Sequence, residues 1–219
     1  MQVSVIIPSK NEPLLGELTE RIHKALSNTK HEVVIIEKGD KLPIVKGAKI
    51  FKQLHDGLGK AVLEGVAKST GNIIVTMDGD FSHDPDDIKN LLKYIKDYDI
   101  VIGSRFVEGG KSLDSKHRKI VSWVFRHFAM ISLGLYVKDN MSGFAAIRRK
   151  VYDRIELNPI GYKINLEILY KAKRKGFTIK EAPIKFHSRK AGKSNVGYNI
   201  RGLKEALRIV SLVIRLRTR

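Results

Sequence analysis

Residues 73–77, five apolar or β-branched side chains in a row, lead directly into Asp78-Gly79-Asp80. The run is too short for a typical helix and follows Gly71-Asn72, so it predicts a buried parallel strand. Gly79 permits a sharp turn, which lets both carboxylates face one point beyond the carboxyl end of the strand. Open α/β sheets bind their ligands at that edge. The alternative is a plain polar turn before a helix that starts near Asp84-Pro85.

The two carboxylates define a candidate metal site. Carboxylate oxygens suit a hard divalent ion such as Mg²⁺ or Mn²⁺, which usually keeps coordination positions for substrate phosphates. The chain has no cysteine, which excludes a disulfide framework and a zinc-thiolate site. We therefore expect Asp78 and Asp80 to bind a divalent ion.

Strand-like and helix-like segments alternate along the 219 residues, of which 42% are hydrophobic. Apolar runs predict strands at residues 3–7, 32–37, 48–51, 73–77, 100–102 and 178–186, and Pro183 marks the last as an edge strand. Apolar side chains at helical spacing predict helices at residues 14–27, 57–69, 85–96, 120–136, 150–155, 166–176 and 198–216. This alternation predicts an α/β fold with a mostly parallel sheet flanked by helices.

The net charge of +18 implies an anionic partner, either nucleic acid, an anionic membrane surface or a phosphorylated substrate. Residues 185–219 hold ten Lys or Arg against one acid, Glu205, which is half of the excess. Zinc-finger, RNP-type and helix-turn-helix patterns are missing, and their absence disfavours nucleic acid.

Two amphipathic segments bear on membrane binding. Residues 120–136 are apolar but include Arg126 and His127, so they form either a core helix or a helix in a membrane interface. Residues 198–216 form a basic amphipathic helix typical of membrane-surface or partner binding. No uncharged apolar stretch reaches the ~18 residues of a membrane span, and the amino terminus has the pattern of a strand rather than a signal peptide. These patterns predict a cytoplasmic protein, peripherally associated with the inner face of the membrane.

Several motifs follow one another in a defined order. They are Val5-Ile6-Ile7-Pro8 with Asn11-Glu12, Gly57-Leu58-Gly59-Lys60-Ala61, residues 77–85, Gly103-Ser104-Arg105-Phe106 with Gly109-Gly110, Ser142-Gly143-Phe144, Glu181-Ala182-Pro183, and Arg189 with Gly192-Lys193-Ser194. In order and spacing they resemble family 2 glycosyltransferases with the GT-A (Rossmann-like) fold. Within that family the chain is similar to the polyprenyl-phosphate branch, which includes the dolichol-phosphate mannose synthases. It lacks the Gln-x-x-Arg-Trp motif of processive polysaccharide synthases.

The resemblance implies inverting transfer of a sugar from a nucleotide sugar, GDP-mannose being favoured, to a polyprenyl (dolichyl) phosphate at the cytoplasmic membrane face, with Mg²⁺ or Mn²⁺ as cofactor. It also admits a membrane-anchoring partner subunit. A UDP-sugar donor such as UDP-glucose and a soluble acceptor remain alternatives, and a nucleic-acid-binding protein is the alternative of a different class. A phosphate acceptor is already anionic near pH 7, with a second pKa of about 6, so no strong general base is required. The site must instead position two anions and neutralise the diphosphate leaving group.

The resemblance also assigns roles to individual residues. The expected catalytic residues are Asp80, Arg105, Arg118, Arg189 and Lys193. The expected nucleotide-sugar contacts are Pro8, Lys10, Glu12, Glu37, Lys38, Asp40, Lys60, Asp78, Gly79 and Asp80, and the expected metal ligands are Asp78, Asp80 and Ser82. Residues 1–196 would form the catalytic domain, with a nucleotide-sugar half (1–112), an amphipathic helical segment (113–137) and an acceptor half (138–196). Residues 197–219 would form the basic carboxyl-terminal helix.

Two departures from the family pattern affect specificity. Residues 37–40, Glu-Lys-Gly-Asp, stand where the family usually has aspartates and a serine, so GDP and UDP both remain open and we expect Lys38 and Asp40 to influence base choice. Ser82 stands where relatives often have glutamine, so the third metal ligand is either Ser82 or water. His83 either caps the helix after it or takes part in the site. Ser142-Gly143 is either a plain turn or, as in the family, a segment next to the donor sugar or acceptor.

Overall fold

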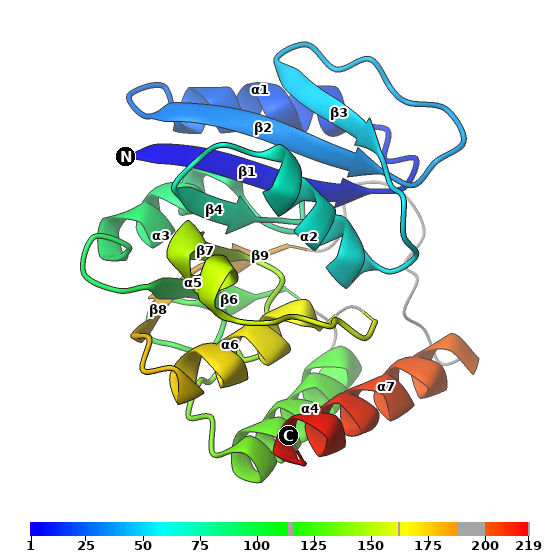
Figure 1. Cartoon of the computed structure of the whole chain (residues 1–219), viewed down its shortest axis with the longest axis vertical. Helices are drawn as coiled ribbons and strands as arrows, with labels where there is room; N and C mark the ends of the chain where they lie inside the picture. Colours follow the sequence, from blue (N-terminus) through cyan, green and yellow to red (C-terminus); the bar gives the residue numbers. More distant parts are fainter. Residues whose placement is uncertain (114–115, 162, 188–199, 219) are drawn as a thin grey trace.

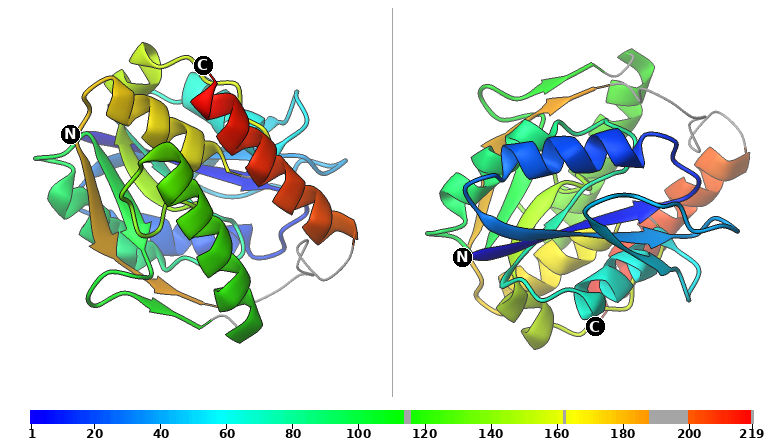
Figure 2. Two further views of the ribbon diagram at one scale, coloured as in Figure 1. Left: turned by 90° about the horizontal axis from the view of Figure 1, so that it is seen from below. Right: turned by 90° about the horizontal axis from the view of Figure 1, so that it is seen from above.

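A computed structural model describes residues 1–113, 116–161, 163–187 and 200–218. A central sheet carries helices on both faces (Figures 1 and 2). The core on one face contains side chains of α1 (Leu15–Ala25) and α3 (Ile88–Tyr94). The core on the other face contains side chains of α2 (Leu58–Lys68), α4 (Lys116–Leu133), α5 (Arg149–Arg154), α6 (Ile164–Arg174) and α7 (Ile200–Arg217).

The sheet has seven strands in the order β3-β2-β1-β4-β7-β5-β8. Their bounds are β1 (Gln2–Ser9), β2 (Lys30–Glu37), β3 (Ala48–Lys52), β4 (Ile73–Thr76), β5 (Ile100–Ser104), β7 (Ala145–Arg148) and β8 (Ile179–Pro183). All neighbours pair in parallel except β7, which is antiparallel to β4 and β5. The predicted mostly parallel α/β sheet is therefore confirmed, and β8 lies at its edge as Pro183 indicated.

Side chains of the strands alternate between the two cores, as a pleated strand requires. In β1, Val3, Val5 and Ile7 pack against the α1–α3 side. Ile6 between them packs on the α2 side. Both faces of the central strands are covered, which explains why these strands appear in the sequence as continuous apolar runs.

The sequence did not predict β7 or the short strand β6 (Lys111–Ser112). The strand predicted at residues 178–186 is divided in the structure into β8 and β9 (Lys185–Phe186), and β9 pairs in parallel with β6. Strand β7 begins with Ala145 and Ala146, which have low strand propensity. Both alanines and Ile147 are completely buried between β4 and β5. Tertiary packing, rather than local preference, makes this segment a strand.

Two consecutive arginines, the last residue of β7 and the first of α5, donate hydrogen bonds to carbonyls at the carboxyl ends of helices on opposite faces of the sheet. The Arg149 guanidinium donates to the carbonyls of Val66, Ser69 and Gly71 at the end of α2. Arg148 donates to the carbonyls of Ile95, Lys96 and Tyr98 at the end of α3. Carbonyls at helix ends lack partners within the helix, so these bonds satisfy groups that would otherwise be left open.

We expect Arg149→Met to lower the free energy of unfolding by about 2–3 kcal/mol, because several charge-assisted hydrogen bonds are lost together. The melting temperature should fall by about 5–10 °C. Thermal unfolding followed by circular dichroism measures this change. Arg154→Met, on the exposed end of α5, is the matched control. Equal melting temperatures for the two variants would contradict the capping role.

Candidate functional site

The site lies at the edge of the sheet where the parallel strands have their carboxyl ends. Strands β1 and β4 are neighbours with Ile6 opposite Thr76, so Pro8 and Asp78 emerge side by side. A cleft opens here, bounded by β1, β4, α2, α6 and the loop before β7. Its lining residues are Pro8, Leu58, Val62, Thr76, Met77, Asp78, Met141, Ser142, Gly143, Lys163, Ile164, Asn165 and Leu166.

Asp78 and Asp80 differ in exposure. The Asp78 side chain is 41% exposed and lines the cleft. Asp80 is only 6% exposed, and its Oδ1 accepts a hydrogen bond of 3.0 Å from the backbone N–H of Ser82. Phe81, which lies between Asp80 and Ser82, has a φ of 60°, in the left-handed region, so the chain reverses sharply here. The Asp-Gly-Asp stretch is thus a tight turn, and it lies at the sheet edge that the sequence predicted.

The oxygen atoms in this turn fit a hard divalent cation. The Ser82 hydroxyl is buried and has no hydrogen-bond partner among the described residues. Two carboxylates and this hydroxyl form a set of hard oxygen donors, which is the chemistry that Mg²⁺ and Mn²⁺ prefer. In the described ranges no third acidic residue or histidine completes a cluster of three. Such an ion would keep positions for water and substrate phosphates. We call Asp78, Asp80 and Ser82 the carboxylate corner.

His83 does not cap the following helix, since the Asp84 side chain accepts from the Asp86 N–H at its start. Instead its buried ring contacts Asp78, because Nδ1 accepts from the Asp78 N–H at 3.3 Å and lies 3.8 Å from Oδ2. The ring stacks on Phe144 and meets Phe186 edge-on. Burial lowers the pKa of the His83 imidazole, and the charges of Asp78 and Asp80 only partly offset this. A neutral imidazole therefore supports the backbone of the carboxylate corner.

Ser142-Gly143 lies against the same corner. A Cβ atom added to Gly143 would be 3.6 and 3.7 Å from the two oxygens of Asp78. The Thr76 hydroxyl donates to the Gly143 carbonyl at 2.9 Å, which fixes this backbone beside β4. The segment is therefore part of the site and not a distant surface turn.

Three predicted nucleotide-binding lysines surround one exposed carboxylate. Lys38 forms an ion pair of 2.7 Å with Asp56, just before α2. The hydrogen bond and charge of Lys38, with the more distant charges of Lys60 and Lys10, lower the pKa of Asp56. These lysines come from the ends of β1 and β2 and the start of α2, so the fold gathers separate cations at the sheet edge.

Glu37 joins the loops after β1 and β2. It is almost completely buried, and its carboxylate accepts from the Ser9 hydroxyl at 2.6 Å and from the N–H groups of Asn11 and Gly39. This arrangement holds the loops in place, while direct contact of Glu37 with a nucleotide stays a prediction. Asp40 follows on the exposed loop, and Glu12 approaches Gly79, whose added Cβ would lie 3.6 Å from Glu12 Cγ.

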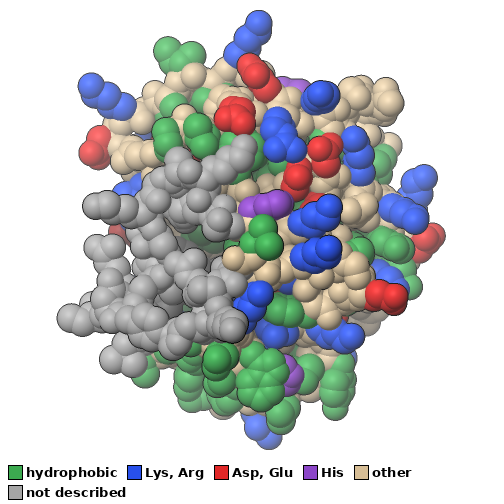
Figure 3. Space-filling view, turned by 180° about the vertical axis from the view of Figure 1, so that it is seen from behind, with side chains coloured by type: hydrophobic (Ala, Val, Ile, Leu, Met, Phe, Trp, Pro, Cys, Tyr) green, Lys and Arg blue, Asp and Glu red, His purple; other side chains and the backbone are tan. Residues whose placement is uncertain are grey.

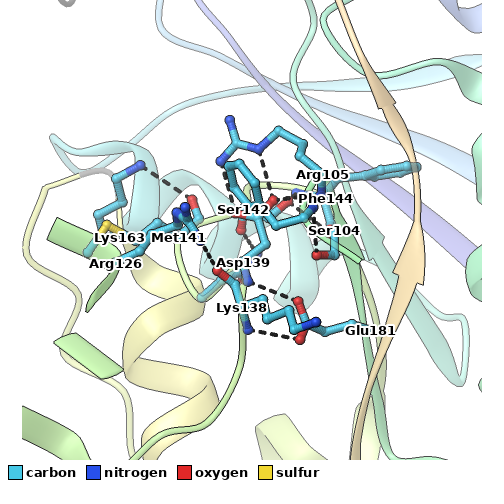
Figure 4. A network of polar contacts seen from close by, with 12 residues as sticks. Ser104, Arg105, Arg126, Lys138, Asp139, Met141, Ser142, Phe144, Lys163 and Glu181 are labelled. Carbon is cyan, nitrogen blue, oxygen red and sulfur yellow. Dashed lines mark hydrogen bonds and ion pairs between the residues drawn. The ribbon is translucent and has the colours of Figure 1, made fainter. Parts of the chain in front are cut away.

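Arg105 reaches the site from the end of β5 (Figure 4). Its guanidinium lies 4.9 Å from the ring centroid of Phe186, and the Phe186 and His83 centroids are 5.3 Å apart. Arg105 also forms a bidentate bond to the buried Asp139. The sequence did not single out Asp139; the available signal was an acid close to Ser142-Gly143.

The structure gathers most of the predicted residues at one edge of the sheet. These are Pro8, Lys10, Glu12, Glu37, Lys38, Asp40, Lys60, Asp78, Gly79, Asp80, Ser82 and Arg105. Arg118 belongs to α4, but its side chain lies outside the described residues, as do Arg189 and Lys193. The roles predicted for these three stay predictions.

Comparison with known proteins identifies the family. The glycosyl transferase family 2 model matches residues 4–156. The dolichol-phosphate mannosyltransferase of Pyrococcus furiosus is 38% identical over 211 residues, which cover 90% of this chain and 59% of that protein. The polyprenol monophosphomannose synthase of Mycolicibacterium smegmatis is 30% identical, covering 90% of this chain and 82% of that protein. The chain belongs to glycosyl transferase family 2.

Comparison with solved structures shows the fold. A crystal structure of glucosyl-3-phosphoglycerate synthase from Mycobacterium tuberculosis, in complex with Mn²⁺, UDP and phosphoglyceric acid, aligns with a TM-score of 0.70 at 17% identity. The alignment covers 98% of this chain and 76% of that one. The predicted GT-A fold is confirmed. The chain spans 59% of the length of the Pyrococcus relative, so its sheet and helices correspond to part of that protein.

Proposed function

We propose that this protein is a metal-dependent glycosyltransferase that transfers a sugar from a nucleotide sugar to a polyprenyl phosphate at a membrane surface. GDP-mannose is the favoured donor. The relatives described above are named dolichol-phosphate mannosyltransferase and polyprenol monophosphomannose synthase, which supports mannose as the transferred sugar. The carboxylate corner, of which Asp78 lines the cleft at the sheet edge, is the observation that carries the proposal.

The chemistry follows from the charges at this edge. Asp78 and Asp80 would hold the divalent ion, which would neutralise the diphosphate leaving group. Lys10 and Lys60 would supply further positive charge for the nucleotide phosphates, and Lys38 would lie near the base. Arg105 offers planar N–H donors that match a phosphoryl oxyanion. Because the acceptor is already ionised, none of these residues has to remove a proton from it.

The acceptor phosphate carries a long lipid, so the enzyme must reach the bilayer surface. The outward side of α4 exposes several large apolar residues, which are Ile120, Val121, Trp123, Val124, Phe128 and Ile131. Figure 3 shows apolar side chains gathered at the lower end of the molecule, where α4 lies. Helix α7 packs beside α4 and exposes Leu207 and Ile214. We call this surface the α4–α7 apolar face.

Helix α4 has features of both interpretations of residues 120–136, a core helix and a helix in a membrane interface. Ala129 and Leu133 of α4 are buried in the core, while Ile131 is 77% exposed. Such an amphipathic helix suits a membrane interface, where each nearby Lys or Arg adds about 1 kcal/mol on an anionic leaflet. Within the described residues, no helix has the combined length and apolar character required to cross a bilayer.

A donor screen tests the function. The purified protein is incubated with a polyprenyl phosphate, Mg²⁺ or Mn²⁺, and GDP-mannose, UDP-glucose or other nucleotide sugars. We expect metal-dependent formation of a mannosyl phospholipid from GDP-mannose. Product from a UDP-sugar alone would select the alternative donor. Absence of glycolipid with every donor, together with salt-sensitive binding of nucleic acid, would instead favour the binding-protein alternative.

We expect Lys38→Asp to change the ratio of GDP to UDP affinity by about tenfold, which corresponds to ~1.4 kcal/mol. The substitution breaks the ion pair with Asp56 and reverses a charge at the end of β2. Calorimetric titration with each nucleotide measures the ratio. Lys30→Asp, at the opposite end of the same strand, is the control. An unchanged ratio would exclude Lys38 from base selection.

A further inference from the structure

Asp139 is a completely buried carboxylate in the loop between α4 and β7. Arg105 donates to it three times, from its backbone N–H at 3.0 Å, from Nε at 2.8 Å and from Nη2 at 2.9 Å (Figure 4). Both carboxylate oxygens are engaged, and the paired groups are separated by 34 positions in the chain. The bidentate bond fixes the plane of the guanidinium as well as its position.

The loop carrying Asp139 is itself held from two sides. Glu181 of β8 accepts from the backbone N–H groups of Lys138 at 2.8 Å and Asp139 at 2.9 Å. Arg126 of α4 donates to the Lys138 carbonyl. The Arg126 guanidinium also stacks over the ring of Phe106, 3.6 Å from its centroid. Phe106 is the residue that follows Arg105 in the sequence. Contacts from β8 and α4 thus converge on the backbone that presents the Asp139 carboxylate.

The same loop continues to the carboxylate corner. The Asp139 carbonyl accepts from the Ser142 N–H at 3.2 Å, and Gly143 then lies against Asp78. One short segment therefore contacts Arg105 at one end and a predicted metal ligand at the other. Its conformation sets the separation between the guanidinium and the corner.

We propose that Asp139 and Glu181 are positioning residues for Arg105, with Glu181 fixing Asp139 and Asp139 fixing the guanidinium toward the phosphoryl group of the acceptor. The proposal rests on the proposed function. Neither carboxylate touches the substrate; both act through Arg105. The buried Asp139 carboxylate, whose backbone Glu181 holds, sets the orientation of the Arg105 cation before the acceptor arrives, so less reorganisation is needed during transfer.

A double-mutant cycle tests this dependence. We expect Asp139→Asn to lower kcat/KM for the polyprenyl phosphate by about 10- to 100-fold, and Arg105→Gln to do so by at least as much. Because Asp139 acts through Arg105, Asp139→Asn should add less than about threefold in the Arg105→Gln background. The KM for the nucleotide sugar should change less than about twofold. If the loss of kcat/KM in the double variant equalled the product of the losses in the two single variants, the proposal would be overturned.

Two further variants separate positioning from simple loss of structure. Glu181→Gln keeps the size of the side chain at a half-buried position, and we expect the same acceptor-selective loss at about fivefold. Asp99→Asn removes a carboxylate that pairs with Lys150 at the opposite end of β5, and should leave acceptor kinetics unchanged. If Asp99→Asn reproduced the Asp139→Asn effect, a general stability effect would explain both and the positioning role would be wrong.

The ¹⁵N NMR signal of the Arg105 Nε–H distinguishes failure of this inference from failure of the proposed function. The signal is assigned by its loss in Arg105→Lys. We expect slow hydrogen exchange in the wild type and faster exchange with a shifted resonance in Asp139→Asn and Glu181→Gln. An unaltered signal in both variants overturns the positioning role of Asp139 and Glu181. If the signal changes in these variants but the wild type forms no glycolipid, the positioning role stands and the acceptor assignment is wrong.

Discussion

Replacing Asp80 by asparagine is expected to lower kcat/KM for sugar transfer by at least about a thousandfold, or ~4 kcal/mol of transition-state stabilisation. Asp80 is buried in the turn after β4, where its Oδ1 accepts from the Ser82 N–H. The amide of asparagine keeps the shape and can still accept this bond, but it loses the negative charge that binds a cation. The fold should therefore survive while the metal affinity falls.

Initial rates at a range of donor and acceptor concentrations, measured at several Mn²⁺ concentrations, give kcat/KM and test this expectation. Asp86→Asn is the matched control, because Asp86 is exposed and its ion pairs with Arg21 and Lys89 lie at the surface, where such pairs contribute little. Circular dichroism should give equal melting temperatures for both variants. Wild-type activity of Asp80→Asn at all metal concentrations would remove the carboxylate corner from the reaction.

Placing a carboxylate on the α4–α7 apolar face is expected to release the protein from anionic vesicles. Ile131→Glu should weaken vesicle binding by about 30-fold or more, since it removes roughly 2 kcal/mol of apolar burial and adds a repelled charge. Ile131 is largely exposed, so the folded core should tolerate the change. Transfer to a membrane-embedded acceptor should fall in parallel, while nucleotide affinity should stay constant.

Flotation with vesicles containing anionic lipid measures the partition. Ile44→Glu introduces the same residue at a fully exposed isoleucine in the loop before β3, away from α4 and α7. The control should float with the vesicles as the wild type does. Equal losses for Ile131→Glu and Ile44→Glu would show that net charge alone controls binding, and unchanged flotation of Ile131→Glu would exclude this face as the membrane contact.

Elements with strong local patterns were predictable from the sequence, and elements defined by their neighbours were not. The run from Ile73 ends at the sheet edge because β-branched residues, a turn glycine and two aspartates all specify the same local structure. Strand β7 has no such local signal. Ala145 and Ala146 are strand residues only because little room remains between β4 and β5 under helices on both faces.

The same distinction applies to the site. Asp78, Asp80 and Ser82 lie within one turn, so their spacing predicts that they act together. Arg105 and Asp139 are far apart in the chain and meet only when β5 and the loop before β7 are placed in the fold. The spacing of these two residues in the sequence does not predict their contact. The gathering of Lys10, Lys38 and Lys60 around Asp56 depends likewise on the order of the strands.

The most direct measurement is a crystal structure with Mn²⁺ and GDP, with the metal located by anomalous scattering. The proposed function requires an anomalous peak about 2.0–2.2 Å from a carboxylate oxygen of Asp78 or Asp80, with the diphosphate completing its coordination. A nucleotide bound elsewhere, with no manganese beside these two side chains, would contradict the central claim.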